Sequence, residues 1–327
     1  MREFLSLPID GSAHGLAIDN MLAIIHRLML VLFLGWGAFF AYTLIRFRQK
    51  KNPVADYTGV TSHVSSYLEI AVALFEAVLL IGLAVPLWAK RVSDFPSEKD
   101  ATVVRVVAEQ FAWNIHYPGA DGVFGRTDIS LISDDNPLGL DRSDPFAKDD
   151  IATINQLHVP VNKPVIVRLS SKDVIHSFNL PTMRVKQDAI PGQVIPLWFT
   201  PTKTTDQMIG EMAKKYQLKA EGTSPELFER IAIGDFIGKD STTILKKGDV
   251  FTQEMIRPLL DAGVTEVLAA PNVTTEIACA QLCGLGHYRM RGYLSVDTKE
   301  AYAAWMADQV SQLPHDSTVV ASPAQEK

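Results

Sequence analysis

The chain has 327 residues, of which 47% are hydrophobic and 21% are charged, and its formal net charge is −6. This balance excludes a wholly disordered chain, which needs low hydrophobicity and high net charge. It also disfavours a nucleic-acid-binding protein, which usually carries a basic surface. The two cysteines, Cys279 and Cys283, are too few for a disulfide framework or for a four-cysteine zinc or iron–sulfur site.

Two apolar runs, at residues 20–45 and 67–89, lie near the N-terminus. About 20 helical residues are enough to cross the bilayer core, so we predict a hairpin of two transmembrane helices within residues 1–92. The loop between the runs carries four basic residues, whereas the tail before them carries only Arg2. Since basic loops stay in the cytoplasm, both termini and everything after the hairpin are predicted on the periplasmic side of a bacterial inner membrane.

Glu69 lies inside the second apolar run, close to its cytoplasmic start. Ionisable groups at membrane depth are rare and often mark proton paths. Two interpretations are open: an interfacial carboxylate whose side chain reaches back to water, and an entrance group that passes protons to a partner subunit.

Short runs rich in β-branched and aromatic residues begin at residue 102 and are separated by Pro, Gly and Asn. This pattern is typical of an antiparallel sandwich or barrel. We predict such a β domain over residues 93–202 and 274–310, with a turn-rich, acidic and solvated loop at 119–150. A docking patch for a basic partner is the alternative role of that loop.

Residues 203–273 interrupt the β pattern. Three runs within them are predicted to be helical: 208–218, 224–237 and 252–263. Gly263 is a plausible helix stop, and 264–270 is a short strand candidate. We therefore expect a mixed helical insert, which either contacts a partner or is a tolerated surface insertion. The polar tail at 311–327 is predicted to be disordered.

The residues with the clearest chemistry form the run Cys279-Ala280-Gln281-Leu282-Cys283-Gly284-Leu285-Gly286-His287-Tyr288-Arg289-Met290. Thiolate, imidazole and thioether groups together favour copper. Zinc does not usually recruit Met, and a c-type haem needs a C-x-x-C-H motif that the sequence lacks. His176, between two strand-like runs, is the candidate for a second imidazole. A disulfide, a mononuclear blue-copper site and two coppers bridged by thiolates are the alternatives, of which the second Cys favours the last.

These motifs follow two predicted spans in one chain. They are S-S-K-D-V-I-H-S-F at 170–178, D-A-I-P-G at 188–192 and the Cys–His–Met run at 279–290. In this combination the chain resembles subunit II of the haem–copper cytochrome c oxidases over residues 20–202 and 274–310. The resemblance implies a two-helix hairpin followed by a cupredoxin-like all-β barrel, which holds a dinuclear copper centre called CuA.

The resemblance also implies a role for each donor of the centre. Cys279 and Cys283 would be bridging thiolates, His176 and His287 would each bind one copper, and Met290 and the backbone carbonyl of Gln281 would be axial ligands. Gln281 also stands where the family often carries a Glu that helps to bind magnesium at the interface with subunit I. An amide oxygen can ligate but has no charge, which weakens the prediction of magnesium.

A subunit of this family receives electrons from a cytochrome c and passes them to haem in subunit I, where oxygen is reduced to water with proton pumping. The chain would thus be part of an oxidoreductase whose oxygen chemistry resides in a partner. The implied partners are subunit I and other oxidase subunits, the lipid bilayer and a separate donor. That donor is a cytochrome c or a membrane-bound haem c subunit, such as that of a quinol-oxidising complex in a supercomplex.

Two further positions follow from the resemblance. The family's Q-W-x-W motif is Gln110-Phe111-Ala112-Trp113 here, so Phe111 and Trp113 are the candidates that receive the electron, and plain core or surface aromatics are the alternative. Glu69 matches a Glu linked to the proton channel called K. Two other functions stay open: subunit II of a CuA-containing nitric oxide reductase, and a membrane-tethered copper-binding module without electron transfer.

Overall fold

The computed structural model describes residues 7–55, 57–58, 61–239, 241–271 and 275–313. The chain separates into two compact units. One is the helical segment His14–Phe95, and the other joins Ile9–Ala13 to the residues from Pro96 onward.

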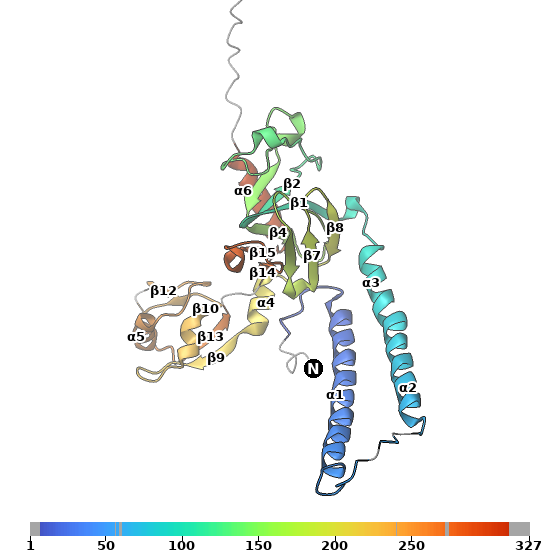
Figure 1. Ribbon diagram of the computed structural model, residues 1–327. Helices are drawn as coiled ribbons and strands as arrows, with labels where there is room; N and C mark the ends of the chain where they lie inside the picture. Colours follow the sequence, from blue (N-terminus) through green and yellow to red (C-terminus); the bar gives the residue numbers. More distant parts are fainter. Residues whose placement is uncertain (1–6, 56, 59–60, 240, 272–274, 314–327) are drawn as a thin grey trace, which may run out of the picture. The chain divides into compact units, whose positions relative to one another are not determined.

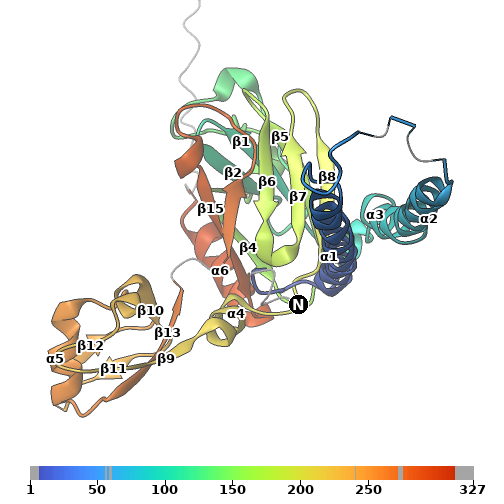
Figure 2. The same cartoon turned by 60° about the horizontal axis from the view of Figure 1, so that its bottom comes forward.

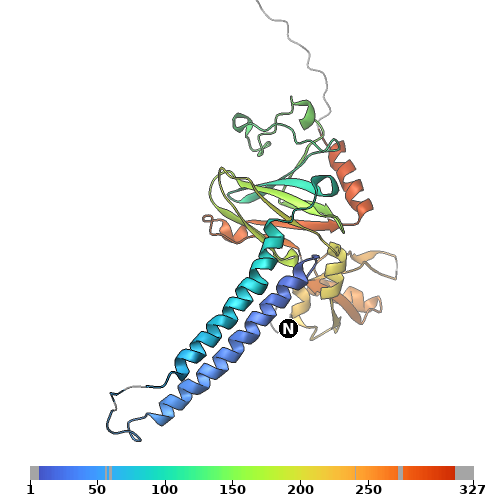
Figure 3. The ribbon, with the colours of Figure 1, turned by 90° about the vertical axis from the view of Figure 1, so that its right-hand side faces the viewer.

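The helical unit is a hairpin of long apolar helices, drawn in blue and cyan in Figure 3. Its elements are α1 (Gly15–Arg46), α2 (Val64–Leu79), a π-helical turn (Leu80–Ala84) and α3 (Val85–Val92). Pro86 accounts for the π turn: it has no N–H to donate, and the wider turn lets the helix continue past it. Both helical stretches are long and apolar enough to cross a membrane, which confirms two apolar helices at the predicted positions.

Two five-stranded sheets enclose the core of the second unit (Figures 1 and 2). The first sheet has the order β3-β2-β1-β5-β8, with β1 at Thr102–Glu109, β2 at Ala112–Tyr117, β3 at Ile151–Ile154, β5 at Val165–Ser171 and β8 at Ile195–Phe199. The second has the order β4-β15-β14-β6-β7, with β4 at Gln156–Pro160, β6 at His176–Leu180, β7 at Val185–Ala189, β14 at Glu276–Cys279 and β15 at Arg291–Asp297.

The sheets are mixed, whereas the sequence pattern predicts antiparallel ones. β1 pairs with β5 in parallel, and β15 pairs with β4 in parallel. A parallel pair needs a long crossover, and the chain between β1 and β5 supplies one because it contains β2, β3 and β4. Side chains alternate along β1, so that Val104, Val106 and Ala108 are fully buried. This alternation is the period-2 pattern of a strand with one face on a core.

The residues before α1 belong to this β unit. Gly11 donates its N–H to the Thr182 carbonyl at 2.9 Å, and its own carbonyl accepts from the Thr202 N–H at 2.7 Å. The Ile9 side chain is 3% exposed and lies in the main core. We call Ile9–Ala13 the N-terminal strap, because it is tied to the β unit by backbone hydrogen bonds and by burial.

The acidic loop after β2 is turn-rich, as predicted, and its carboxylates hold its own backbone. Asp149 Oδ2 accepts from the Ala120 N–H at 2.6 Å. Asp150 Oδ2 accepts from the Gly125 N–H at 2.8 Å and lies 2.6 Å from His116 Nε2, with both side chains buried. These acidic residues therefore order the loop internally.

The insert has a hydrophobic core of its own, which includes the fully buried side chains of Leu227, Phe251 and Leu259. Its elements are α4 (Thr205–Met212), β9 (Lys214–Gln217), β10 (Arg230–Ala232), β11 (Phe236–Ile237), β12 (Thr243–Leu245), α5 (Gln253–Asp261) and β13 (Glu266–Pro271). The predicted helix at 252–263, its stop at Gly263 and the strand at 264–270 are confirmed as α5, a positive-φ glycine and β13.

Two helix predictions in the insert are wrong. Within 208–218 the helix ends at Met212, and the following residues form β9, which pairs with β13. Within 224–237 a short 3₁₀ turn precedes β10 and β11. Strands of two to four residues have no recognisable period, so their partners rather than their own sequence decide the conformation.

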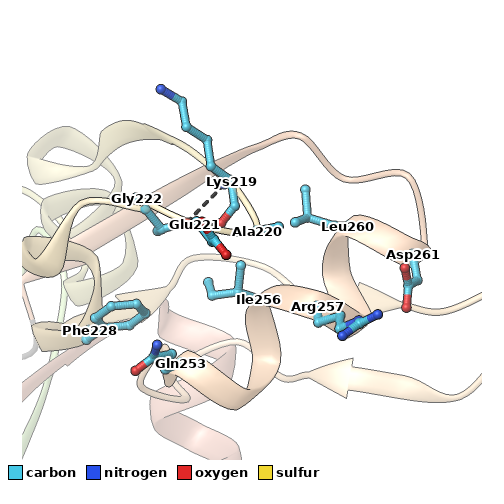
Figure 4. A pocket seen from close by; sticks show the side chains of 11 residues that line it. Lys219, Ala220, Glu221, Gly222, Phe228, Gln253, Ile256, Arg257, Leu260 and Asp261 are labelled. Carbon is cyan, nitrogen blue, oxygen red and sulfur yellow. Dashed lines mark hydrogen bonds between the residues drawn. The ribbon is translucent and has the colours of Figure 1, made fainter.

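A pocket of about 760 Å³ lies in the insert between α5 and residues 219–223 (Figure 4). Lys219 and Asp261 bring opposite charges to its lining, and Ile256 and Leu260 form an apolar part of its wall. None of the predicted site residues lines it.

The β unit is expected to remain folded when residues 218–265 are replaced by Asn-Gly. Gln217 of β9 lies opposite Glu266 of β13 in an antiparallel pair, so a two-residue hairpin turn can join them. α4 must stay, because the Met208 side chain is fully buried in the main core and Thr205 Oγ1 accepts from the Val296 N–H at 2.9 Å. Thermal unfolding followed by circular dichroism measures the outcome.

The comparison for this excision is a deletion of residues 205–270, which removes Met208 and is expected to lower the melting temperature. If both variants lose the same amount of melting temperature, residues 218–265 themselves stabilise the β unit, and the prediction is wrong.

After the insert and the Cys–His–Met run, the chain ends its described part with α6 (Lys299–Ser311). Most of the tail predicted to be disordered, residues 314–327, lies outside the described residues.

Candidate metal centre

Strand pairing brings the first cysteine beside the first histidine. In the antiparallel pair of β14 and β6, Cys279 lies opposite Phe178, and the Ala280 N–H donates to the Ser177 carbonyl at 2.9 Å. His176 begins β6 and Cys279 ends β14, so both side chains are at the same end of the second sheet. Cys279 Sγ lies 3.9 Å from His176 Nδ1.

The chain from Cys279 to Met290, which we call the metal loop, turns back and brings four more donors to the same place. Cys283 Sγ lies 3.8 Å from Cys279 Sγ, 3.6 Å from His287 Nδ1 and 3.8 Å from Met290 Sδ. The Gln281 carbonyl oxygen lies 3.2 Å from Cys279 Sγ. All six donors predicted from the sequence are therefore gathered in one cluster.

The separations suit metal ions bound between the donors. A disulfide needs sulfurs at about 2.05 Å, and both cysteines are free thiols here. A metal–thiolate bond is about 2.3 Å, so one ion can bond both sulfurs across 3.8 Å. Each sulfur lies near one imidazole, and a thioether and a carbonyl oxygen complete the cluster. Two ions held here could each bind one imidazole and both sulfurs. The residues present thus fit a copper pair.

The two thiols differ in acidity. Burial opposes ionisation of Cys279, but hydrogen bonds from His176 and from backbone groups outweigh it and lower its pKa to about 6. Burial raises the pKa of Cys283 to about 11, and the neighbouring Cys279 thiolate adds to the increase. Burial also opposes the protonation of His176, yet its hydrogen bonds to Cys279 and Asp173 raise its pKa above the ordinary value. In the metal-free chain, Cys279 is the thiolate at neutral pH.

Alkylation of the metal-free chain is therefore expected to modify Cys279 first, with a rate that rises through a midpoint near pH 6. An ordinary thiol, with a pKa of about 8.5, gives a midpoint more than two pH units higher. As the pH falls below 6, the Cys279 thiolate is protonated and the reaction slows. Fragment-ion mass spectrometry separates the two cysteines, which share one peptide. Equal labelling, or a midpoint near pH 8.5, would contradict the assignment.

Asp173 holds the outer nitrogen of His176. Its Oδ1 lies 2.8 Å from His176 Nε2, and its Oδ2 accepts from the Gln110 N–H at 2.7 Å. Burial opposes ionisation of this carboxyl, but these hydrogen bonds lower its pKa below the ordinary value. A carboxylate on the outer ring nitrogen fixes which nitrogen faces a metal, because Nδ1 is left for the ligand role.

Of the other residues predicted from the sequence, two aromatic residues lie beside the donor cluster and Glu69 lies in the helical unit. The Phe111 ring packs on the metal loop, where a Cβ added to Gly286 would lie 2.4 Å from it. Trp113 is fully buried and packs edge-on against His176, with ring centroids 6.2 Å apart. Glu69 is on α2, in the helical unit. The Gln281 side chain is exposed.

The metal loop exposes three large apolar or aromatic side chains. Leu282, Leu285 and Tyr288 are 77%, 98% and 76% exposed. Large apolar side chains clustered in this way on one loop are typical of a surface that another protein covers.

Sequence reasoning missed two residues of this site, Gln110 and Asp173. Asp173 had a signal, since it precedes His176 by three residues in one motif. Gln110 begins the Q-W-x-W-like motif, but its contact with Cys283 had no signal because the two residues are far apart in the sequence.

Comparisons with known proteins find similar sequences of one kind. Residues 102–211 match the family model described as cytochrome c oxidase subunit II, periplasmic domain. The chain is 29% identical over 273 residues to an alternative cytochrome c oxidase subunit 2 of Bradyrhizobium diazoefficiens, which covers 83% of this chain and 72% of that protein. It is 33% identical over 174 residues to cytochrome c oxidase subunit 2 of Cereibacter sphaeroides, or 48% of this chain and 54% of that one.

Among solved structures, the periplasmic domain of subunit II of the cytochrome oxidase of Bradyrhizobium japonicum matches 67% of this chain and 99% of its own length. The sequence identity is 20% and the TM-score is 0.34. The family match covers β1 to β8 of the β unit, which is a cupredoxin-like barrel. The chain is therefore similar to cytochrome c oxidase subunit II, whose members are part of an oxidoreductase complex of the haem–copper type.

Proposed function

We propose that the chain is the electron-accepting subunit of a respiratory haem–copper oxidase and that its metal loop holds CuA. The observation that carries the proposal is the cluster of six donors, in which both sulfurs lie within 4 Å of each other and each also lies within 4 Å of an imidazole nitrogen. When bound, a thiolate-bridged copper pair supplies one-electron redox chemistry. The chain's own residues make and break no substrate bond.

The protein's part is to hold the donors still. His176 is fully buried and fixed by Asp173, Cys283 is 4% exposed, and Met290 is 1% exposed. Cys279 and His176 stand on paired strands rather than on a free loop. Donors fixed in this way need little rearrangement between redox states, which keeps the barrier to electron transfer low.

The partners of this function would contact the exposed side chains of the metal loop. The exposed apolar side chains of the metal loop, Leu282, Leu285 and Tyr288, offer a surface that subunit I or a cytochrome c-type donor can cover. The donor is a separate cytochrome c or a membrane-bound haem c subunit. Phe111, which packs on the loop, is placed to contact a protein that docks there. Gln281 offers magnesium no charge, so the proposal contains copper only.

Orientation in the bacterial inner membrane is part of the proposal. The strap before α1 is tied to the β unit, and the β unit also follows α3. Two spans that leave from and return to the same unit place the basic loop of residues 46–51 on the opposite side, which is the cytoplasm by the positive-inside rule. Glu69 is then near the cytoplasmic end of α2, where a carboxylate can pass protons to subunit I.

The full-length chain, purified in detergent and loaded with copper, tests the proposal. We expect a purple species whose electron paramagnetic resonance spectrum has a seven-line copper hyperfine pattern, because one electron shared equally by two copper nuclei gives that splitting. A four-line spectrum, or no copper uptake, would contradict it.

A further inference from the structure

Gln110 lies in the tight connection between β1 and β2, directly above the metal loop. Its side-chain Nε2 donates to the Cys283 carbonyl at 2.5 Å. The Cys283 sulfur has three neighbouring donors in the cluster, namely Cys279, His287 and Met290. The Gln110 amide thus fixes the backbone of Cys283, whose sulfur lies next to His287 and Met290.

The same residue also reaches the other half. The Gln110 backbone N–H donates to Asp173 Oδ2 at 2.7 Å, and Asp173 Oδ1 lies 2.8 Å from His176 Nε2. His176 in turn faces Cys279. One residue therefore connects the Cys283 side through its side chain and the His176 side through its backbone.

The metal loop packs closely against the β1–β2 connection. A Cβ added to Gly284 would lie 2.6 Å from Gln110 Nε2, and one added to Gly286 would lie 2.4 Å from the Phe111 ring. A larger residue at Gly284 would push the Gln110 amide aside, and one at Gly286 would displace the Phe111 ring. The two glycines and the β1–β2 connection form one contact surface over the metal loop.

We propose that Gln110 is a positioning residue that joins the two halves of the metal centre. The inference rests on the proposed function for its copper readout. Gln110 is itself exposed, so its side-chain hydrogen bond contributes little to the stability of the β unit. Its role is to fix the separation of the donors.

Two substitutions separate the amide donor from the shape of the side chain. Gln110→Met keeps the length and removes the donor, and Gln110→Glu keeps the shape but places a carboxylate against the Cys283 carbonyl. The matched control is Gln156→Met, an exposed glutamine on β4 in the second sheet. All variants are made in the full-length chain in detergent.

Copper release to a chelator is the first readout. We expect Gln110→Met to release copper about fivefold faster, the size of one lost neutral hydrogen bond, and Gln110→Glu to release it faster still. The hyperfine pattern should change in both variants, whereas Gln156→Met should match the wild type. The melting temperature of the copper-free chain should be unchanged in all three.

A second readout needs no copper. Loss of the Gln110 amide frees the Cys283 backbone, so alkylation of Cys283 in the metal-free chain should be about fivefold faster in Gln110→Met. Wild-type rates of copper release and of Cys283 alkylation in Gln110→Met would overturn the inference. So would a copper-free melting temperature that falls in Gln110→Met but not in Gln156→Met, because it would show a general role in the fold. If the wild type takes up no copper pair, the proposed function fails, and the alkylation rates still decide the role of Gln110.

Discussion

Cys283→Ser is expected to abolish the dinuclear copper signal and to slow electron transfer from a reduced cytochrome c by at least about 100-fold. Even residues that only orient metal ligands cost 10–100-fold when removed. Cys283 is 4% exposed, and its sulfur lies within 4 Å of Cys279, His287 and Met290. A serine hydroxyl stays protonated at neutral pH and cannot bridge two ions.

Cys279→Ser provides the matched comparison. It keeps the set Cys283, His287 and Met290, so we expect this variant to bind a single copper with a four-line spectrum. The difference between the two cysteines follows from the donors that surround each of them. A seven-line spectrum in Cys283→Ser would contradict the bridging role, and identical spectra in both variants would contradict the asymmetry.

Trp113→Ala is expected to destabilise the β unit by about 3–5 kcal/mol, the usual cost of removing a large buried aromatic side chain. The Trp113 ring is fully buried and packs edge-on against Phe178, with centroids 5.4 Å apart, and against His176. The cavity left behind lies next to His176, a proposed copper ligand, so copper affinity should fall together with stability. For a unit of this size the melting temperature should fall by roughly 10 °C.

The control for this substitution is Tyr293→Ala, whose side chain is 54% exposed on β15. We expect a change within about 0.5 kcal/mol for it, as for other surface positions. Denaturant unfolding of the copper-free chain measures both variants. A cost for Trp113→Ala that is no larger than that of Tyr293→Ala would show that the indole is not a core residue.

The fold was predictable wherever a long run of the sequence has one composition. The helices α1 and α2 are predicted by long, mainly apolar runs, and β1 by its enrichment in β-branched residues. The insert strands β9 and β10 were not, because they are too short for a period and form only where β13 lies beside them. The parallel pairing of β1 with β5 also depends on a partner distant in the sequence.

The same distinction holds for the candidate site. The metal loop places most of its donors within twelve consecutive residues, so their proximity was predictable from spacing. The place of Gln110 was not, since its role depends on how closely a glycine-containing loop approaches another turn. Local donors are visible in a sequence, whereas a contact such as that of Gln110 with Cys283 is visible only in the fold.

The N-terminal strap has a consequence for biogenesis. Gly11 leaves the ribosome long before its hydrogen-bond partners Thr182 and Thr202. In the proposed orientation, the strap therefore crosses the membrane early and cannot form these hydrogen bonds until the β unit has been exported. Closing this long-range contact is expected to be among the last steps of folding, since contacts between distant residues form slowly. Until then Ile9 is an exposed apolar side chain beside an unfilled position in the core, a state that periplasmic chaperones or proteases can recognise.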